Sequence, residues 1–228
     1  MFSPEMKMSD LVNLDYRLLT VISRMGIKVG FGERSVAEVC SMNGVDTATF
    51  ILVCTMYSLP EFVPDKNSIA AVRPGIIVDY LHNSHSSYIK YGFMEIEKAM
   101  KELVEPCDTK QKKIILSFLA GYRKEVENHF DYEEQTLFPY VRAMLDGTAD
   151  GSYTIAEFRE QHSNIEEKLE DLKNIVLKYL PENCDSELAG RVLMQLFSLA
   201  EDLDIHTAIE NNILVPVMYM IENNGAAV

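Results

Sequence analysis

Two stretches of this chain repeat one pattern of histidine, glutamate, leucine and proline, and this repeat constrains the fold more than any other feature. The first stretch runs from His129 to Pro139 and the second from His206 to Pro216, with Glu four residues and Leu eight residues after His. Residues four apart share one face of an α-helix, so each stretch predicts a helix carrying adjacent imidazole and carboxylate groups. The proline is expected to bend the end of each helix. The repetition indicates a duplicated helical hairpin with a pseudo-twofold axis.

Apolar residues recur at three- and four-residue steps along most of the chain, which is typical of amphipathic helices. The longest periodic segments cover residues 76–104, 109–146, 154–180 and 186–222, and Gly or Pro follows each of them closely. Short connections favour antiparallel neighbours. We therefore predict an all-α fold whose main part, residues 75–228, is an up-down-up-down four-helix bundle.

The first quarter of the chain, residues 1–59, predicts a separate small helical domain. Helices are expected at residues 8–25, from residue 35 onward and at residues 45–59. Three prolines follow within fifteen positions, and proline lacks the amide hydrogen that a helix needs. We therefore predict a linker at residues 60–74.

The first and third long segments each add one histidine, His82 and His162. In antiparallel hairpins of these lengths, each of them would lie level with a His-x-x-x-Glu pair. Four imidazoles and two carboxylates suit two irons joined by both carboxylates and by an oxo or hydroxo bridge. Imidazole also suits zinc and copper, but four-coordinate zinc would not need six side chains. The predicted ligands are His82, His129, Glu133, His162, His206 and Glu210.

Two neighbouring residues are given no ligand role by this interpretation. His85 is interpreted as a supporting or solvated side chain, because Ile165 is taken as its counterpart in the second half. Glu134 is expected to point away from Glu133 by about 100° of helix rotation and to be solvated.

Composition excludes several classes of function. The formal net charge of −14 disfavours duplex nucleic acid and anionic membranes, which attract basic surfaces. The longest apolar stretch, residues 48–59, is shorter than the ~20 residues that span a bilayer, and residues 1–10 lack the apolar core of a secretion signal. The four cysteines form no C-x-x-C pair and are interpreted as reduced thiols. We expect a cytoplasmic protein.

Taken together, these residues resemble the hemerythrin-like family of His-His-Glu cation-binding proteins over about residues 76–219. Within that family, the chain is similar to the di-iron proteins that repair iron centres under nitrosative and oxidative stress and that carry a short helical N-terminal domain. The fragments that support the resemblance are Leu81-His82-Asn83-Ser84-His85, His129 to Pro139, Glu160-Gln161-His162, His206 to Pro216, Met25-Gly26-Ile27 and Gly30-Phe31-Gly32.

The resemblance implies a di-iron site that binds or reduces nitric oxide, and a role in restoring damaged iron–sulfur clusters. The implied partners are a small diatomic molecule and iron–sulfur proteins. The family's N-terminal Cys-Cys-Gly-Gly turn is replaced here by Gly30-Phe31-Gly32-Glu33, so no thiol pair is available at that turn.

Alternatives without turnover stay open: a sensor that binds dioxygen or iron, and a protein that delivers iron. The sequence also leaves open whether nitric oxide or dioxygen is the natural ligand. It does not settle whether the protein acts as a nitric oxide reductase or whether it forms a homodimer.

Overall fold

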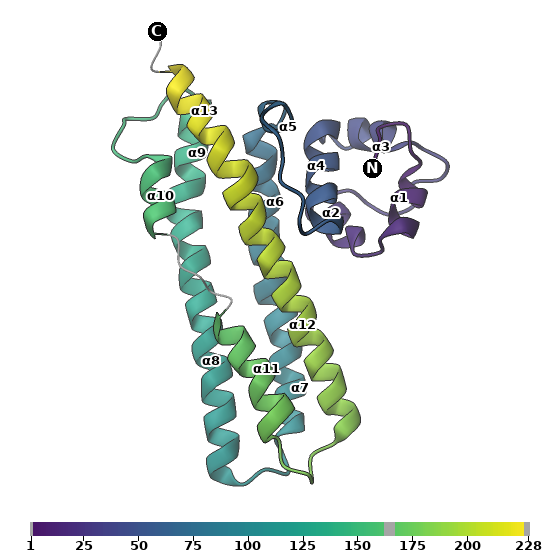
Figure 1. The fold of residues 1–228 in the computed structure, drawn as a ribbon, viewed down its shortest axis with the longest axis vertical. Helices are drawn as coiled ribbons and strands as arrows, with labels where there is room; N and C mark the ends of the chain where they lie inside the picture. The colour runs from purple at the N-terminus through teal and green to yellow at the C-terminus, as the bar shows by residue number, and fades with distance from the viewer. Residues whose placement is uncertain (1, 162–166, 226–228) are drawn as a thin grey trace. The chain divides into compact units, whose positions relative to one another are not determined.

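The computed structural model describes residues 2–161 and 167–225 and confirms an all-α protein (Figure 1). Within these residues every regular element is a helix, apart from one isolated antiparallel bridge between Lys7 and Ser35. The chain forms two compact units, which are described separately below. The first comprises Met1–Ser84, Thr136–Gln161 and Ile205–Val228, and the second His85–Gln135 and His162–Asp204.

The first unit begins with four short helices: α1 (Met8–Leu14), α2 (Leu18–Arg24), α3 (Val36–Met42) and α4 (Thr47–Ser58). The prediction of one helix at residues 8–25 is wrong, because the chain breaks between α1 and α2. The Asp15 carboxylate accepts a hydrogen bond of 3.0 Å from the Arg17 amide. Such a local bond offers the backbone an alternative to the helical hydrogen bond.

Side-chain caps begin the next two helices of this unit. Ser35 and Glu38 form a reciprocal capping box at the start of α3, and Asp46 caps α4 by accepting from the Thr49 amide at 2.9 Å. Gly26, at φ +72°, follows α2 in the left-handed conformation that suits glycine at a helix end.

The first unit also contains α5 (Lys66–Ala70), α9 (Phe138–Leu145), α10 (Ile155–Gln161), α13 (Val215–Gly225) and most of α6 (Pro74–Ser87). Helix α5 lies inside the predicted linker and begins at the cap Asp65. The predicted division into a domain at 1–59, a linker at 60–74 and a bundle at 75–228 stays a prediction, because the compact units reflect contacts and not independent folding.

The second unit consists of long helices that share one apolar core. Its α-helices are α7 (Met94–Leu103), α8 (Thr109–Tyr132), α11 (Glu167–Tyr179) and most of α12 (Ser186–Ile209). Each helix contributes buried side chains to this core, among them Met100, Tyr122, Leu172 and Leu196. Burying each such side chain is worth about 1.5–3 kcal/mol. The core therefore holds these helices together as a helical bundle, whose predicted up-down-up-down order stays a prediction.

Three helices of the chain pass through a π-helical turn without interruption. The turns are η1 (Tyr88–Phe93), which joins α6 to α7, η2 (Glu133–Leu137), which joins α8 to α9, and η3 (Glu210–Leu214), which joins α12 to α13. Proline follows two residues after η2 and after η3, at Pro139 and Pro216. Its ring clashes with the carbonyl four residues earlier, and a π turn relieves that clash. The prolines therefore change the helical turn without ending the helix.

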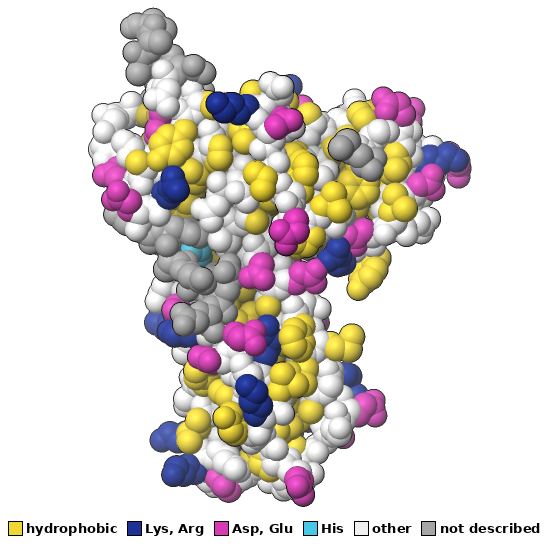
Figure 2. Space-filling view, viewed as in Figure 1, with side chains coloured by type: hydrophobic (Ala, Val, Ile, Leu, Met, Phe, Trp, Pro, Cys, Tyr) yellow, Lys and Arg dark blue, Asp and Glu magenta, His cyan; other side chains and the backbone are white. Residues whose placement is uncertain are grey.

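On the face shown in Figure 2, acidic side chains are scattered among basic ones, so the negative charge is not gathered into one patch there.

Among the described residues, no single helix is long and apolar enough to cross a membrane. Helices α3 and α4 meet that length and composition when taken together, across a bend of 119°.

Candidate metal centre

Two glutamates, Glu133 and Glu210, are completely buried although they carry carboxylates. Both have an exposed fraction of 0%, and they are the first residues of η2 and η3. Removing a carboxylate from water costs several kcal/mol unless it is paired or binds a cation. Their burial therefore requires compensating groups close by.

Histidines of the preceding helical turn supply part of this compensation. The Nε2 atom of His129 lies 2.9 Å from Oε1 of Glu133, and Nε2 of His206 lies 3.2 Å from Oε1 of Glu210. Both histidines are buried, at 7% and 2% exposure. Each predicted His-x-x-x-Glu pair is thus in contact, as the shared helix face requires.

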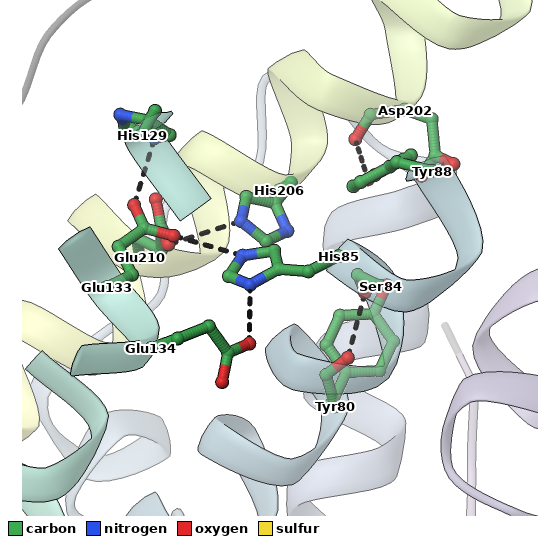
Figure 3. Close-up of polar contacts among 10 residues, drawn as sticks. All are labelled: Tyr80, Ser84, His85, Tyr88, His129, Glu133, Glu134, Asp202, His206 and Glu210. Atoms are coloured by element: carbon green, nitrogen blue, oxygen red, sulfur yellow. Dashed lines mark hydrogen bonds and ion pairs between the residues drawn. The ribbon is translucent and has the colours of Figure 1, made fainter. Parts of the chain in front are cut away.

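A third histidine, His85 near the end of α6, contacts Glu133 from another helix (Figure 3). Its Nε2 atom lies 3.0 Å from Oε2 of Glu133, and its Nδ1 atom lies 2.8 Å from Oε1 of Glu134. The His85 ring stacks on Phe130 with a centroid distance of 4.0 Å and an angle of 14°. One stacking contact and two polar contacts therefore set the orientation of the imidazole.

Four of these side chains converge on one point. His85, Glu133, His206 and Glu210 each offer a ligand atom, and the four atoms lie within 4.8 Å of one another (Figure 3). Two ligands bound to one metal at about 2.0–2.2 Å lie at most about 4.4 Å apart, so small side-chain movements would close this set around a cation. Imidazole nitrogen and carboxylate oxygen suit iron and zinc. The donor set therefore fits a transition metal.

Two predicted ligands that the structure describes, His129 and His82, are not among these four residues, although His129 contacts Glu133. His82 lies in α6 with an exposed side chain and is not part of the four-residue cluster, whereas His162 lies outside the described residues.

The buried stripe of α6 and η1 passes through Leu81, Ser84, His85 and Tyr88, at the three- and four-residue steps of one helix face. Of the two histidines on this helix, His85 is therefore the one that faces the glutamates.

The internal repeat of the sequence itself points to His85. The two repeats are offset by 77 positions, as His129 and His206 show, and the same offset joins the glutamates, leucines and prolines of the motif. Applied to His162, it leads to His85, whereas His82 corresponds to Arg159. Matching His85 to Ile165 assumed an offset of 80 positions, three more than the repeat has.

Glu134 is also placed differently from its predicted solvated position. Its carboxylate contacts Nδ1 of His85, and its side chain keeps 30% of its exposure. The α-helical rotation of about 100° per residue overestimates the divergence of Glu133 and Glu134, because both lie in η2. A π turn is closed by i→i+5 bonds and rotates less per residue, so both carboxylates can reach one imidazole.

An all-α chain with a buried histidine–carboxylate cluster on its long helices defines a metal-binding helical bundle. The chain belongs to the hemerythrin family, because the model of the hemerythrin HHE cation binding domain matches residues 77–218. This match confirms the predicted family. The cation-binding description agrees with the donor set formed by the buried residues.

The chain is also similar to curated proteins that share one name. The chain is 28% identical over 150 residues to the iron-sulfur cluster repair protein YtfE of Escherichia coli O81 (strain ED1a). It is 27% identical over 150 residues to the proteins of the same name from Escherichia coli O1:K1 / APEC and Shigella boydii serotype 18 (strain CDC 3083-94 / BS512). Each match covers 65% of this chain and 65% of the relative.

Proposed function

We propose that this protein is a non-haem di-iron protein of the nitrosative and oxidative stress response, which binds or reduces nitric oxide and supports the repair of iron–sulfur clusters. The observation that carries the proposal is the buried cluster of His85, Glu133, His206 and Glu210. The relatives' name, iron-sulfur cluster repair protein, supports the repair role. The predicted cytoplasmic location is part of the same proposal.

The proposed ligands are His85, His129, Glu133, His162, His206 and Glu210, with His85 in place of His82. Two contacts support a bridging role for Glu133. Its Oε1 atom faces His129 and its Oε2 atom faces His85. A carboxylate whose two oxygens meet different imidazoles suits a bridge between two irons, each held by its own histidines.

The residues around the site define what the chain itself contributes. Iron bound here would supply a centre for binding diatomic molecules and for electron exchange. Because Glu133 and Glu210 are fully buried, such a centre would lie in a low-dielectric environment, where charge–charge interactions are strong. Glu134 fixes the ring of His85 from the side opposite to Glu133, as carboxylates often do for metal-binding histidines.

The N-terminal helices limit how repair could proceed. The turn at Gly30-Phe31-Gly32-Glu33 has no thiol, and the two cysteines of this region, Cys40 and Cys54, have an exposed fraction of 0%. Burial raises the pKa of Cys40 to about 11 and that of Cys54 well above its ordinary value. Both stay protonated at neutral pH and make poor nucleophiles. We therefore propose that iron or a nitrosyl group does not pass through thiols of this region.

The test is anaerobic loading with ferrous iron, followed by addition of nitric oxide. About two irons per chain are expected, as in other di-iron bundles, together with consumption of nitric oxide and formation of nitrous oxide. Glu210→Gln removes a buried charged oxygen with little change of shape and should lower iron content and nitrous oxide together. Glu95→Gln, on an exposed part of α7, is the matched control.

Each outcome of this test has a distinct meaning. Nitric oxide bound without nitrous oxide would exclude reduction and favour the sensor alternative. Rapid transfer of iron to an apo iron–sulfur protein, without any reaction with nitric oxide, would favour iron delivery. One tightly held zinc that Glu210→Gln does not disturb would contradict the di-iron proposal.

A further inference from the structure

Two cysteines far apart in the sequence, Cys107 and Cys184, lie side by side in the second unit. Their Sγ atoms are 3.6 Å apart although the residues are separated by 77 positions. Cys107 lies in the connection between α7 and α8, and Cys184 in the connection between α11 and α12. Both side chains are half-buried, so small reagents can reach them while the surrounding structure limits their movement.

The backbone on both sides of this pair is fixed by equivalent hydrogen bonds. Each cysteine precedes an aspartate that caps the next helix. Asp108 accepts from the Gln111 amide at 2.8 Å, and Asp185 accepts from the Leu188 amide at 2.8 Å. Asn183 joins the two connections by donating from Nδ2 to the Pro106 carbonyl at 3.1 Å. The two thiols are thus held together by ordered connections.

The pair follows the internal repeat of the chain. The separation of 77 positions is also the offset between His129 and His206. Cys107 and Cys184 are therefore equivalent residues of the two halves. Equivalent residues of a twofold arrangement meet only where they lie close to the axis. Their contact is a consequence of the duplicated architecture, and it lies outside the proposed metal ligands.

We propose that Cys107 and Cys184 form a reversible intramolecular disulfide when a small-molecule disulfide oxidises the protein. The Sγ atoms need to approach from 3.6 Å to about 2.05 Å, a shift that side-chain rotation and a small loop movement provide. The bond would join the α7–α8 connection to the α11–α12 connection. This proposal does not depend on iron or on nitric oxide.

The chemistry is thiol–disulfide exchange in two steps. One cysteine thiolate attacks the small disulfide, forms a mixed disulfide with one half and releases the other half as a thiolate. The second cysteine thiolate then attacks the protein sulfur of the mixed disulfide, forms the Cys107–Cys184 bond and releases the second small thiolate. The two cysteine thiols lose two electrons and two protons, and the small disulfide takes up both.

The surroundings of Cys107 make this exchange depend on pH. Burial, together with the adjacent Cys184 and Asp108, raises the pKa of the Cys107 thiol to about 11, while Lys112 lowers it. Since the thiolate is the reacting form, the Cys107 thiolate fraction near pH 7 is small. At pH values below the pKa, the thiolate fraction increases about tenfold for each unit by which the pH rises. The rate of exchange is therefore expected to increase from pH 7 to pH 9, as the thiolate fraction does.

The experiment treats the reduced full-length protein with oxidised glutathione, counts its thiols and maps its peptides by mass without reduction. Loss of two thiols and a linked peptide pair containing Cys107 and Cys184 are expected. The oxidised protein should also melt about 5–10 °C higher, because the link restricts the unfolded chain. A reducing agent should reverse both changes.

Single variants separate the two steps of the exchange. Cys107→Ser and Cys184→Ser should each keep a glutathione mixed disulfide on the remaining cysteine, because no second thiol can resolve it. Cys40→Ser, which changes a buried cysteine of the first unit, should still form the link. The proposal is overturned if all four thiols survive, if wild type stops at the mixed disulfide, or if the link joins other cysteines or two chains.

Discussion

The Nδ1 atom of His85 lies 2.8 Å from Oε1 of Glu134, on the side of the ring opposite to Glu133. This contact links the partly exposed carboxylate of η2 to the buried cluster. It fixes the orientation of the ring so that Nε2 faces the cluster and not solvent. A residue that would be solvated on an ideal α-helix therefore contacts a histidine of another helix.

Replacing Glu134 should weaken metal binding without loss of fold. Glu134→Ala removes the acceptor of His85 Nδ1, and supporting carboxylates of this kind are worth about 10- to 100-fold in metal affinity. Iron affinity can be measured by competition with a chelator, and circular dichroism checks the helix content. Glu95→Ala is the control at an exposed position of α7. Equal iron affinity in both variants would show that Glu134 is not needed to hold His85.

The two histidines of α6 give a direct comparison of ligand assignments. His85→Ala should lower iron affinity by at least about tenfold, because it removes a nitrogen donor of the cluster. His82→Ala makes the same chemical change three residues earlier at an exposed position and should leave iron content within about twofold of wild type. The iron bound per chain and the affinity for iron show which of the two histidines is a ligand. The reverse pattern would restore His82 as the ligand.

We expect Pro216 to favour metal binding at the expense of helix stability. Pro216→Ala supplies an amide hydrogen that can bond to the Asn212 carbonyl, which allows η3 to become an ordinary α-helical turn. The metal-free protein should gain about 1–3 kcal/mol in unfolding free energy, while iron affinity falls because Glu210 rotates.

The matched control for this variant is Pro74→Ala. Pro74 is the first residue of α6, where proline is tolerated because its missing amide hydrogen has no helical partner. Thermal unfolding of the metal-free chains and chelator competition measure the two effects. Unchanged iron affinity in Pro216→Ala would show that the π turn is not required to position Glu210.

Acid should selectively remove the contribution of Asp15 to the N-terminal helices. Its carboxylate accepts from the Arg17 guanidinium at 2.8 and 2.9 Å and from the Ser58 hydroxyl at 2.8 Å. The bonds from Arg17 lower the pKa of Asp15 most, burial opposes them, and the bond from Ser58 lowers the pKa further. A lowered folded-state pKa means that the stabilisation is present above the unfolded value near 4 and is lost as pH falls through the folded value.

Unfolding of Asp15→Asn at several pH values tests this dependence. At pH 7 the variant should be about 1–2 kcal/mol less stable than wild type, which is typical for hydrogen bonds to charged groups. The difference should shrink toward zero below about pH 3. Asp10→Asn, at an exposed position of α1, is the comparison. A difference that stays constant with pH would show that the charge of Asp15 does not contribute.

Local sequence was sufficient for most of the long helices and for the two His-x-x-x-Glu pairs. The contact between His129 and Glu133 depends only on helical spacing, because residues four apart on a helix are neighbours whatever the rest of the chain does. The break at Asp15 is equally local, but its signal was a side-chain hydrogen bond that hydrophobic periodicity does not detect. The 77-residue offset, followed strictly, would also have selected His85 from the sequence alone.

Tertiary structure decided the relationships between segments. Glu134 reaches His85 because η2 rotates less per residue than an α-helix and because the end of α6 brings its histidine against η2. Cys107 and Cys184 meet because two connections 77 residues apart are brought together by the packing of the helices that they join. Periodicity shows which face of a helix is buried but not which neighbour covers it, because that choice depends on how all the helices pack at once.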